Sequence, residues 1–60
     1  MDPIKILLIE DNIKDSNEFK TCINERTDVK LVGATNSDIE GLSLIKKLLP
    51  DVSVHLQYIH

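Results

Sequence analysis

The sequence predicts an α/β fold, a three-stranded parallel sheet in the order 2-1-3 with two helices. Residues 4–9 form an apolar run broken only by Lys5, which is typical of a strand buried on both faces. Two shorter strand-type patterns follow further along the chain, and a helix-type pattern precedes each of them. Helical crossovers between strands indicate parallel pairing with right-handed connections. Because the first strand is the most apolar, we expect it to lie between the other two.

The first helix is predicted to begin near residue 14 or 15 and to end within the polar stretch 24–28. Phe19, Cys22 and Ile23 share one face at three- and four-residue spacings. This spacing favours Cys22 as a small buried residue, since an unpaired cysteine commonly packs as a small apolar side chain.

The other two strands have weaker patterns than the first. Residues 29–34 mix polar and apolar side chains, which favours a strand near the edge of the sheet. Residues 51–56 alternate, so Val52, Val54 and Leu56 are predicted to share a buried face.

The second helix is predicted over residues 37–49 by the clearest local signal in the chain. Ser37 and Glu40 match a capping box. In this motif the serine hydroxyl accepts a hydrogen bond from the Glu40 amide, and the Glu40 carboxylate accepts one from the Ser37 amide. Gly41 costs about 1 kcal/mol relative to alanine inside a helix, and Pro50 ends the helix. The apolar stripe expected to face the sheet consists of Ile39, Leu42, Ile45, Leu48 and Leu49.

Length and charge restrict the possible functions. Sixty residues make one domain, and a chain of this size buries only about 60% of its unfolded surface. The net charge is -3, and Lys46-Lys47 is the only basic pair, so we expect no nucleic-acid binding by this segment. No apolar run is long enough to span a bilayer, and the N-terminus has no basic signal-peptide region. A cytoplasmic protein without membrane contact is therefore expected.

Two acids, Glu10 and Asp11, follow the first strand directly. In an open α/β sheet, ligands bind beyond the carboxyl ends of the strands, at the point where the strand order reverses. The order 2-1-3 creates such a point beside the first strand. The alternative interpretation is a solvated acidic pair at a strand-to-loop turn.

Several segments together resemble the receiver domain of two-component response regulators, in particular transcriptional regulators of the sporulation-regulator type. Residues 4–12 are similar to the opening strand of a receiver, and residues 29–34 to its second strand. Gly41-Leu42 with residues 48–52 resembles the second helix and the entry to the third strand. The resemblance covers about residues 3–54 and implies that residues 1–60 are the N-terminal half of a flavodoxin-like receiver fold.

The resemblance also implies site residues and partners. Glu10 and Asp11 would help to hold Mg²⁺, and a histidine kinase would be the partner. The aspartate that accepts phosphate in receivers would fall at Leu56, or at His55 with a one-residue gap, and neither is a carboxylate. We therefore expect no phosphoacceptor and no catalytic residue here, and we expect the chain not to be an enzyme. With two carboxylates alone, Mg²⁺ binding is expected to be weak or absent.

Two functions follow from these patterns. The first is a truncated receiver domain of a phosphorelay, from a transcriptional regulator, that does not accept phosphate in this form. The second is a self-associating structural module, with a homo-oligomer formed through the exposed edge of the third strand.

Overall fold

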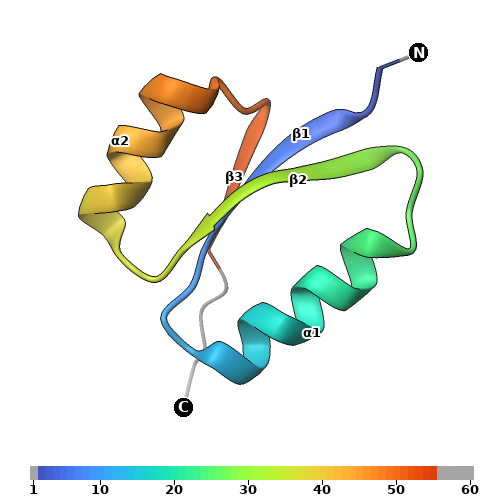
Figure 1. The fold of residues 1–60 in the computed structure, drawn as a ribbon, viewed down its shortest axis with the longest axis horizontal. Helices are drawn as coiled ribbons and strands as arrows, with labels where there is room; N and C mark the ends of the chain where they lie inside the picture. Colours follow the sequence, from blue (N-terminus) through green and yellow to red (C-terminus); the bar gives the residue numbers. More distant parts are fainter. Residues whose placement is uncertain (1, 56–60) are drawn as a thin grey trace.

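The computed structural model describes residues 2–55, which follow one another as β-α-β-α-β (Figure 1). The elements are β1 (Ile4–Ile9), α1 (Ile13–Asn24), β2 (Val29–Thr35), α2 (Asp38–Leu48) and β3 (Val52–His55). Both strand pairs are parallel and the order is β2-β1-β3, so the predicted fold class and topology are confirmed. This order is the first half of the flavodoxin-like order.

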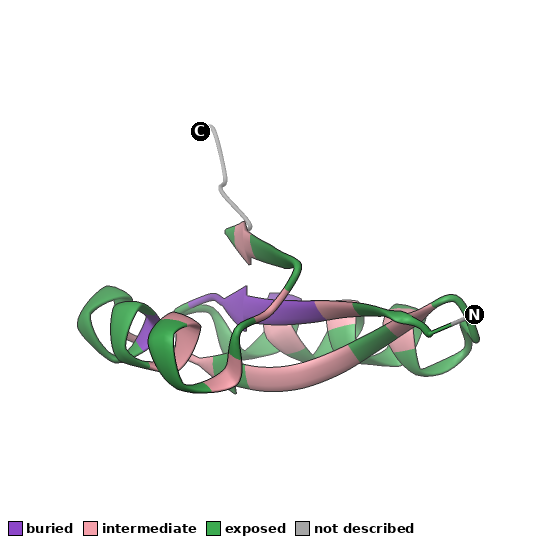
Figure 2. Cartoon of the chain, turned by 90° about the horizontal axis from the view of Figure 1, so that it is seen from above, coloured by how far each residue is buried: buried purple, intermediate pink, exposed green. Residues whose placement is uncertain are grey.

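The core of the molecule is β1. Leu7 and Leu8 have no exposed surface, and Ile6 and Ile9 are also buried; β1 is the buried strand of Figure 2. Leu8 pairs with Ala34 of β2 and with Val54 of β3. A central strand is hydrogen-bonded on both edges and covered on both faces, which explains its nearly continuous apolar sequence.

Helix α2 packs closely against β1 and β2 because two glycines leave room for it. A Cβ atom added to Gly41 would lie 2.5 Å from Cδ1 of Ile9. A Cβ atom added to Gly33 would lie 2.8 Å from Cδ1 of Leu48. Gly41 is therefore a contact point between helix and sheet, which its low helix propensity alone does not indicate.

The rotation of α2 about its axis differs from the prediction. Gly41 is buried, and Leu44 is half-buried, as are two members of the expected stripe, Ile45 and Leu48. The other three members of that stripe are exposed: Ile39 (83%), Leu42 (64%) and Leu49 (70%). The prediction was wrong for Ile39 and Leu42 because Gly41 allows the closest approach and so turns its own side of the helix toward the sheet. It was wrong for Leu49 because α2 ends at Leu48 and Leu49 takes a left-handed conformation.

Helix α1 begins at Ile13, slightly earlier than predicted, because Asn12 caps it. The Asn12 side-chain oxygen accepts from the Asp15 amide at 3.1 Å. Phe19 and Ile23 are half-buried, as expected, but Cys22 is exposed. The prediction for Cys22 was wrong: residues 15, 19 and 23, spaced by four, form the covered face, and Cys22 lies on its flank.

Strand β3 is less covered than its alternating pattern predicted. Val54 is half-buried, but Val52 is 47% exposed. In the part of the chain that the structure describes, α1 packs against β2, and α2 against β1 and β2, so that β3 has little cover from either helix. Leu56, predicted on the same face, lies outside the described residues.

Candidate functional site

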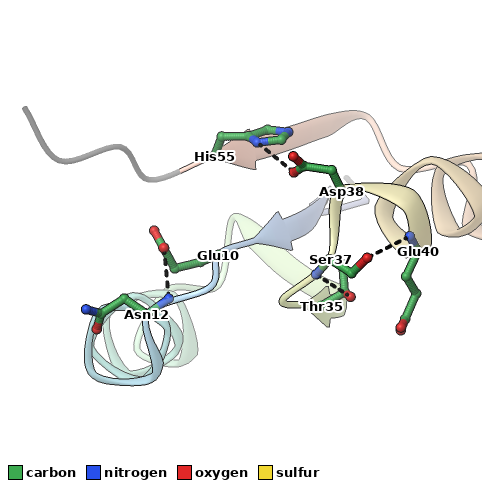
Figure 3. A network of polar contacts seen from close by, with 7 residues as sticks. All are labelled: Glu10, Asn12, Thr35, Ser37, Asp38, Glu40 and His55. Atoms are coloured by element: carbon green, nitrogen blue, oxygen red, sulfur yellow. Dashed lines mark hydrogen bonds and ion pairs between the residues drawn. The ribbon is translucent and has the colours of Figure 1, made fainter.

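The carboxyl ends of the three strands meet at one edge of the sheet, as parallel pairing requires. Ile9, the last residue of β1, pairs with Thr35 of β2 and with His55 of β3. Glu10 follows Ile9 and therefore lies between the ends of the two outer strands. Figure 3 shows Glu10, Thr35 and His55 at this edge. Glu10, Asp11 and His55, the predicted candidate residues that the structure describes, therefore lie at one edge of the sheet.

Glu10 is the most unusual residue at this edge, because its carboxylate is buried. Its residue surface is only 7% exposed, and its amide donates to the Thr35 carbonyl at 2.9 Å. Oε1 accepts from the Asn12 amide at 3.1 Å. Oε2 is buried and has no hydrogen-bond partner among the described residues. A buried carboxylate oxygen without a partner is costly, and a bound cation would relieve that cost.

Asp11, the second acid of the pair, is exposed. The pair therefore combines one buried and one solvated carboxylate. Within residues 2–55 no group of three or more histidine, cysteine, aspartate or glutamate side chains could hold a metal ion. Carboxylate oxygens are the donors that Mg²⁺ prefers, and Mg²⁺ commonly keeps several waters on one or two carboxylates. The donor set fits an open, hydrated Mg²⁺ site rather than a closed protein cage.

His55, one of the two positions considered for the phosphoacceptor, faces the start of α2. Its Nδ1 lies 3.8 Å from Oδ1 of Asp38 (Figure 3). The His55 side chain is 48% exposed and that of Asp38 84%, and an exposed pair at this distance contributes little to stability. Leu56, the other position considered, lies outside the described residues.

The turn from β2 into α2 is held by short-range polar contacts. The Ser37 hydroxyl accepts from the Glu40 amide at 3.4 Å, which confirms half of the predicted capping box. The other half is wrong, since the Ser37 amide donates to Oγ1 of Thr35 at 3.2 Å instead of to the Glu40 carboxylate. Thr35 at the end of β2 therefore takes the place expected for Glu40 (Figure 3).

A shallow hollow of about 310 Å³ lies beside this edge and was not predicted from the sequence. It is bordered by α1, by the end of β2 and by the start of α2. Its lining is mostly polar: Glu10, Ile13, Ser16, Asn17, Lys20, Ala34, Thr35, Asn36 and Glu40. The sequence carries no local signal for it, because three separate segments form it.

Asp15 is a second buried acid that the sequence-based reasoning missed. It lies in the first turn of α1 and is 8% exposed. An acid in that position is favoured by the helix dipole whether or not it is buried, so its sequence position does not predict its burial.

None of the helices found between residues 2 and 55 has the length and apolar character needed to cross a membrane.

Comparisons with known proteins give one group of related sequences. The chain is 31% identical over 49 residues to the transcriptional regulatory protein BtsR of Escherichia coli strain K12. The same identity and length are found with BtsR of Shigella flexneri. In both cases the match covers 82% of this chain and 20% of the relative, so the chain spans about a fifth of the length of these proteins.

No protein-family model and no solved structure matches the chain. The similarity to BtsR supports a general relation of the segment to transcriptional regulatory proteins.

Proposed function

We propose that this segment is the N-terminal half of a receiver-type signalling domain in a transcriptional regulator, and that Glu10 and Asp11 bind Mg²⁺ weakly. The single observation that carries the proposal is the buried Oε2 atom of Glu10, which has no partner among the described residues. The 2-1-3 strand order and the similarity to a transcriptional regulatory protein support it.

The location of Glu10 suits a bound cation. It directly follows the central strand β1, where the chain turns into α1. Strand β3 lies beside β1 at the same edge of the sheet. Asp11, the following residue, adds an exposed carboxylate, so an incoming ion would retain its water on the outer side. Mg²⁺ would neutralise charge at this edge and offset the cost of burying Glu10.

Phosphoryl transfer is not part of what we propose for this segment. A histidine kinase remains the partner that the receiver resemblance implies. The described end of β3 offers an imidazole, His55, in place of a carboxylate, and Asp51 lies at the opposite end of the strand. We expect incubation with acetyl phosphate and Mg²⁺ to leave the intact mass unchanged. A phosphoryl adduct would contradict the expectation that the chain has no phosphoacceptor.

Thermal unfolding in Mg²⁺ tests the metal site. A ligand at about ten times its Kd stabilises a protein by about 1.4 kcal/mol, which raises the Tm of a domain this small by about 5–10 °C. We expect a saturable rise in wild-type Tm and none in Glu10→Gln. Glu18→Gln, at an exposed acid on α1, is the matched control and should respond as wild type does. If Mg²⁺ raised the Tm of Glu10→Gln as much as that of Glu18→Gln, the site would be refuted.

The second candidate function is self-association through the free edge of β3. The sheet order leaves β3 paired only with β1 in the described chain, and three of its four residues are exposed. An unpaired strand edge can pair with another chain. Hydrogen exchange tests this: protection of β3 amides should increase with protein concentration, while that of α1 amides should not. Unchanged β3 protection would exclude the edge as an interface.

A further inference from the structure

Helix α2 carries a second apolar face that the sheet does not use. The first face, which includes Leu44 and Leu48, packs against β1 and β2. Ile39 and Leu42, on the other side of the helix, are largely exposed, and so is Leu49, the C-cap residue that follows the helix. Ile39 and Leu42, three residues apart, lie along one stripe of the helix. Large exposed apolar side chains that lie together mark an interaction surface.

Charges at the two ends of this stripe are of opposite sign. Asp38 begins the helix, and its side chain is almost fully exposed. Lys46 and Lys47 lie in the last turn and are exposed. Lys46 follows Leu42 by four residues and therefore lies within the stripe, where its aliphatic stem can pack while its ammonium group reaches solvent.

We propose that two copies of the chain associate through this stripe, with their α2 helices antiparallel. An antiparallel pair brings Asp38 of each copy toward Lys46 of the other, and it sets the two helix dipoles in opposite directions. A parallel pair would instead place like charges against each other at both ends. A two-fold axis through the interface makes the stripe self-complementary, as a symmetric dimer requires.

The size of the surface sets the expected strength. A helix of 11 residues is about 16 Å long. We expect one pair of helices this short to bury less than the roughly 1,000 Å² that a stable interface should exceed, so the dimer should be weak and concentration-dependent.

Sedimentation equilibrium of the full chain over a range of concentrations tests the interface. We expect the wild-type mass to rise toward that of a dimer, and Leu42→Glu to remain monomeric at every concentration. Because Leu42 is exposed, the variant should keep the wild-type circular dichroism spectrum. Glu40→Gln is the control, since Glu40 is exposed on the same helix and lies one residue from Ile39 and two from Leu42, spacings that place it on another face, and it should dimerise as wild type does.

Charge exchange tests the antiparallel direction. Asp38→Lys and Lys46→Glu should each weaken the dimer, and the double variant should restore it, because the cross-pairs are then reversed but intact. In a parallel dimer, neither single variant would weaken association. The proposal is overturned if the wild type stays monomeric, if Leu42→Glu dimerises like wild type, or if the double variant fails to recover. A Leu42→Glu dimer with protected β3 amides would place the interface at the strand edge instead.

Discussion

Replacing Gly41 by alanine tests the packing of α2 on β1, because helix propensity and packing predict opposite signs. Alanine is favoured over glycine in a helix interior by about 1 kcal/mol. The added Cβ would lie 2.5 Å from Cδ1 and 3.0 Å from Cγ1 of Ile9, which is itself buried. Overpacking of a core costs about 1–3 kcal/mol. We expect Gly41→Ala to lower the free energy of unfolding by up to about 2 kcal/mol.

Removing the obstructing methyl group should reverse this effect. Ile9→Val deletes Cδ1 and costs about 0.5–1.5 kcal/mol by itself. In that background, Gly41→Ala should be neutral or stabilising, since only the tight contact to Cγ1 remains. The coupling between the two positions should fall in the range of about 0.5–3 kcal/mol that is typical of residues in contact.

Urea unfolding monitored by circular dichroism measures all four variants of this cycle. The pair Ser43→Gly and Ser43→Ala gives the propensity difference at an exposed position of the same helix, expected to be about 1 kcal/mol in favour of alanine. If Gly41→Ala stabilises the wild-type protein by that same amount, the close approach of α2 to Ile9 is refuted.

Three further substitutions probe the core, a cap and an ion pair. Leu7→Ala, at a fully buried position, should cost about 2–5 kcal/mol and leave little folded protein by circular dichroism. Asn12→Ala removes the acceptor that caps α1 and should cost about 1 kcal/mol in urea unfolding. Arg26 lowers the pKa of Asp28, chiefly through its side-chain hydrogen bond. Arg26→Ala should therefore raise the Asp28 pKa in a carboxyl-carbon NMR titration, and an unchanged pKa would show that the pair does not persist in solution.

The sign of the Asp28 effect on stability follows from linkage. A carboxyl whose pKa is lower in the folded state stabilises the protein above its unfolded pKa, and this contribution is lost as the pH falls through the folded pKa. Because both side chains are well exposed, the loss should be small. Arg26→Ala should remove it, so that the variant and the wild type converge in stability in acid.

The central strand could be predicted from the sequence because its signal is strong and local. Four successive buried residues in β1 require an uninterrupted apolar run, and two helical crossovers then determine a parallel sheet with β1 in the middle. The position of Glu10 at the carboxyl edge follows from the same reasoning. The burial of Glu10 does not follow from that reasoning, because a residue directly after a strand can equally well be exposed to solvent.

The rotation of α2 could not be predicted from hydrophobicity alone. The helix has apolar residues on two sides, and residues 39 and 42 fit a stripe as well as residues 44, 45 and 48 do. The structure selects between the two sides through the missing side chain of Gly41. The capping of Ser37 was likewise predicted only in part, because Thr35, a residue outside the capping box, accepts the Ser37 amide.

The most direct test of the account is a Mg²⁺ titration followed by the side-chain carboxyl-carbon resonances of the full chain. The central claim is that Glu10 and Asp11 form one weak cation site. The resonances of both should shift together and saturate, while that of Glu18 should not change at constant ionic strength. Uniform small shifts of all carboxyl carbons, or none at Glu10, would show that the acidic pair does not form a Mg²⁺ site.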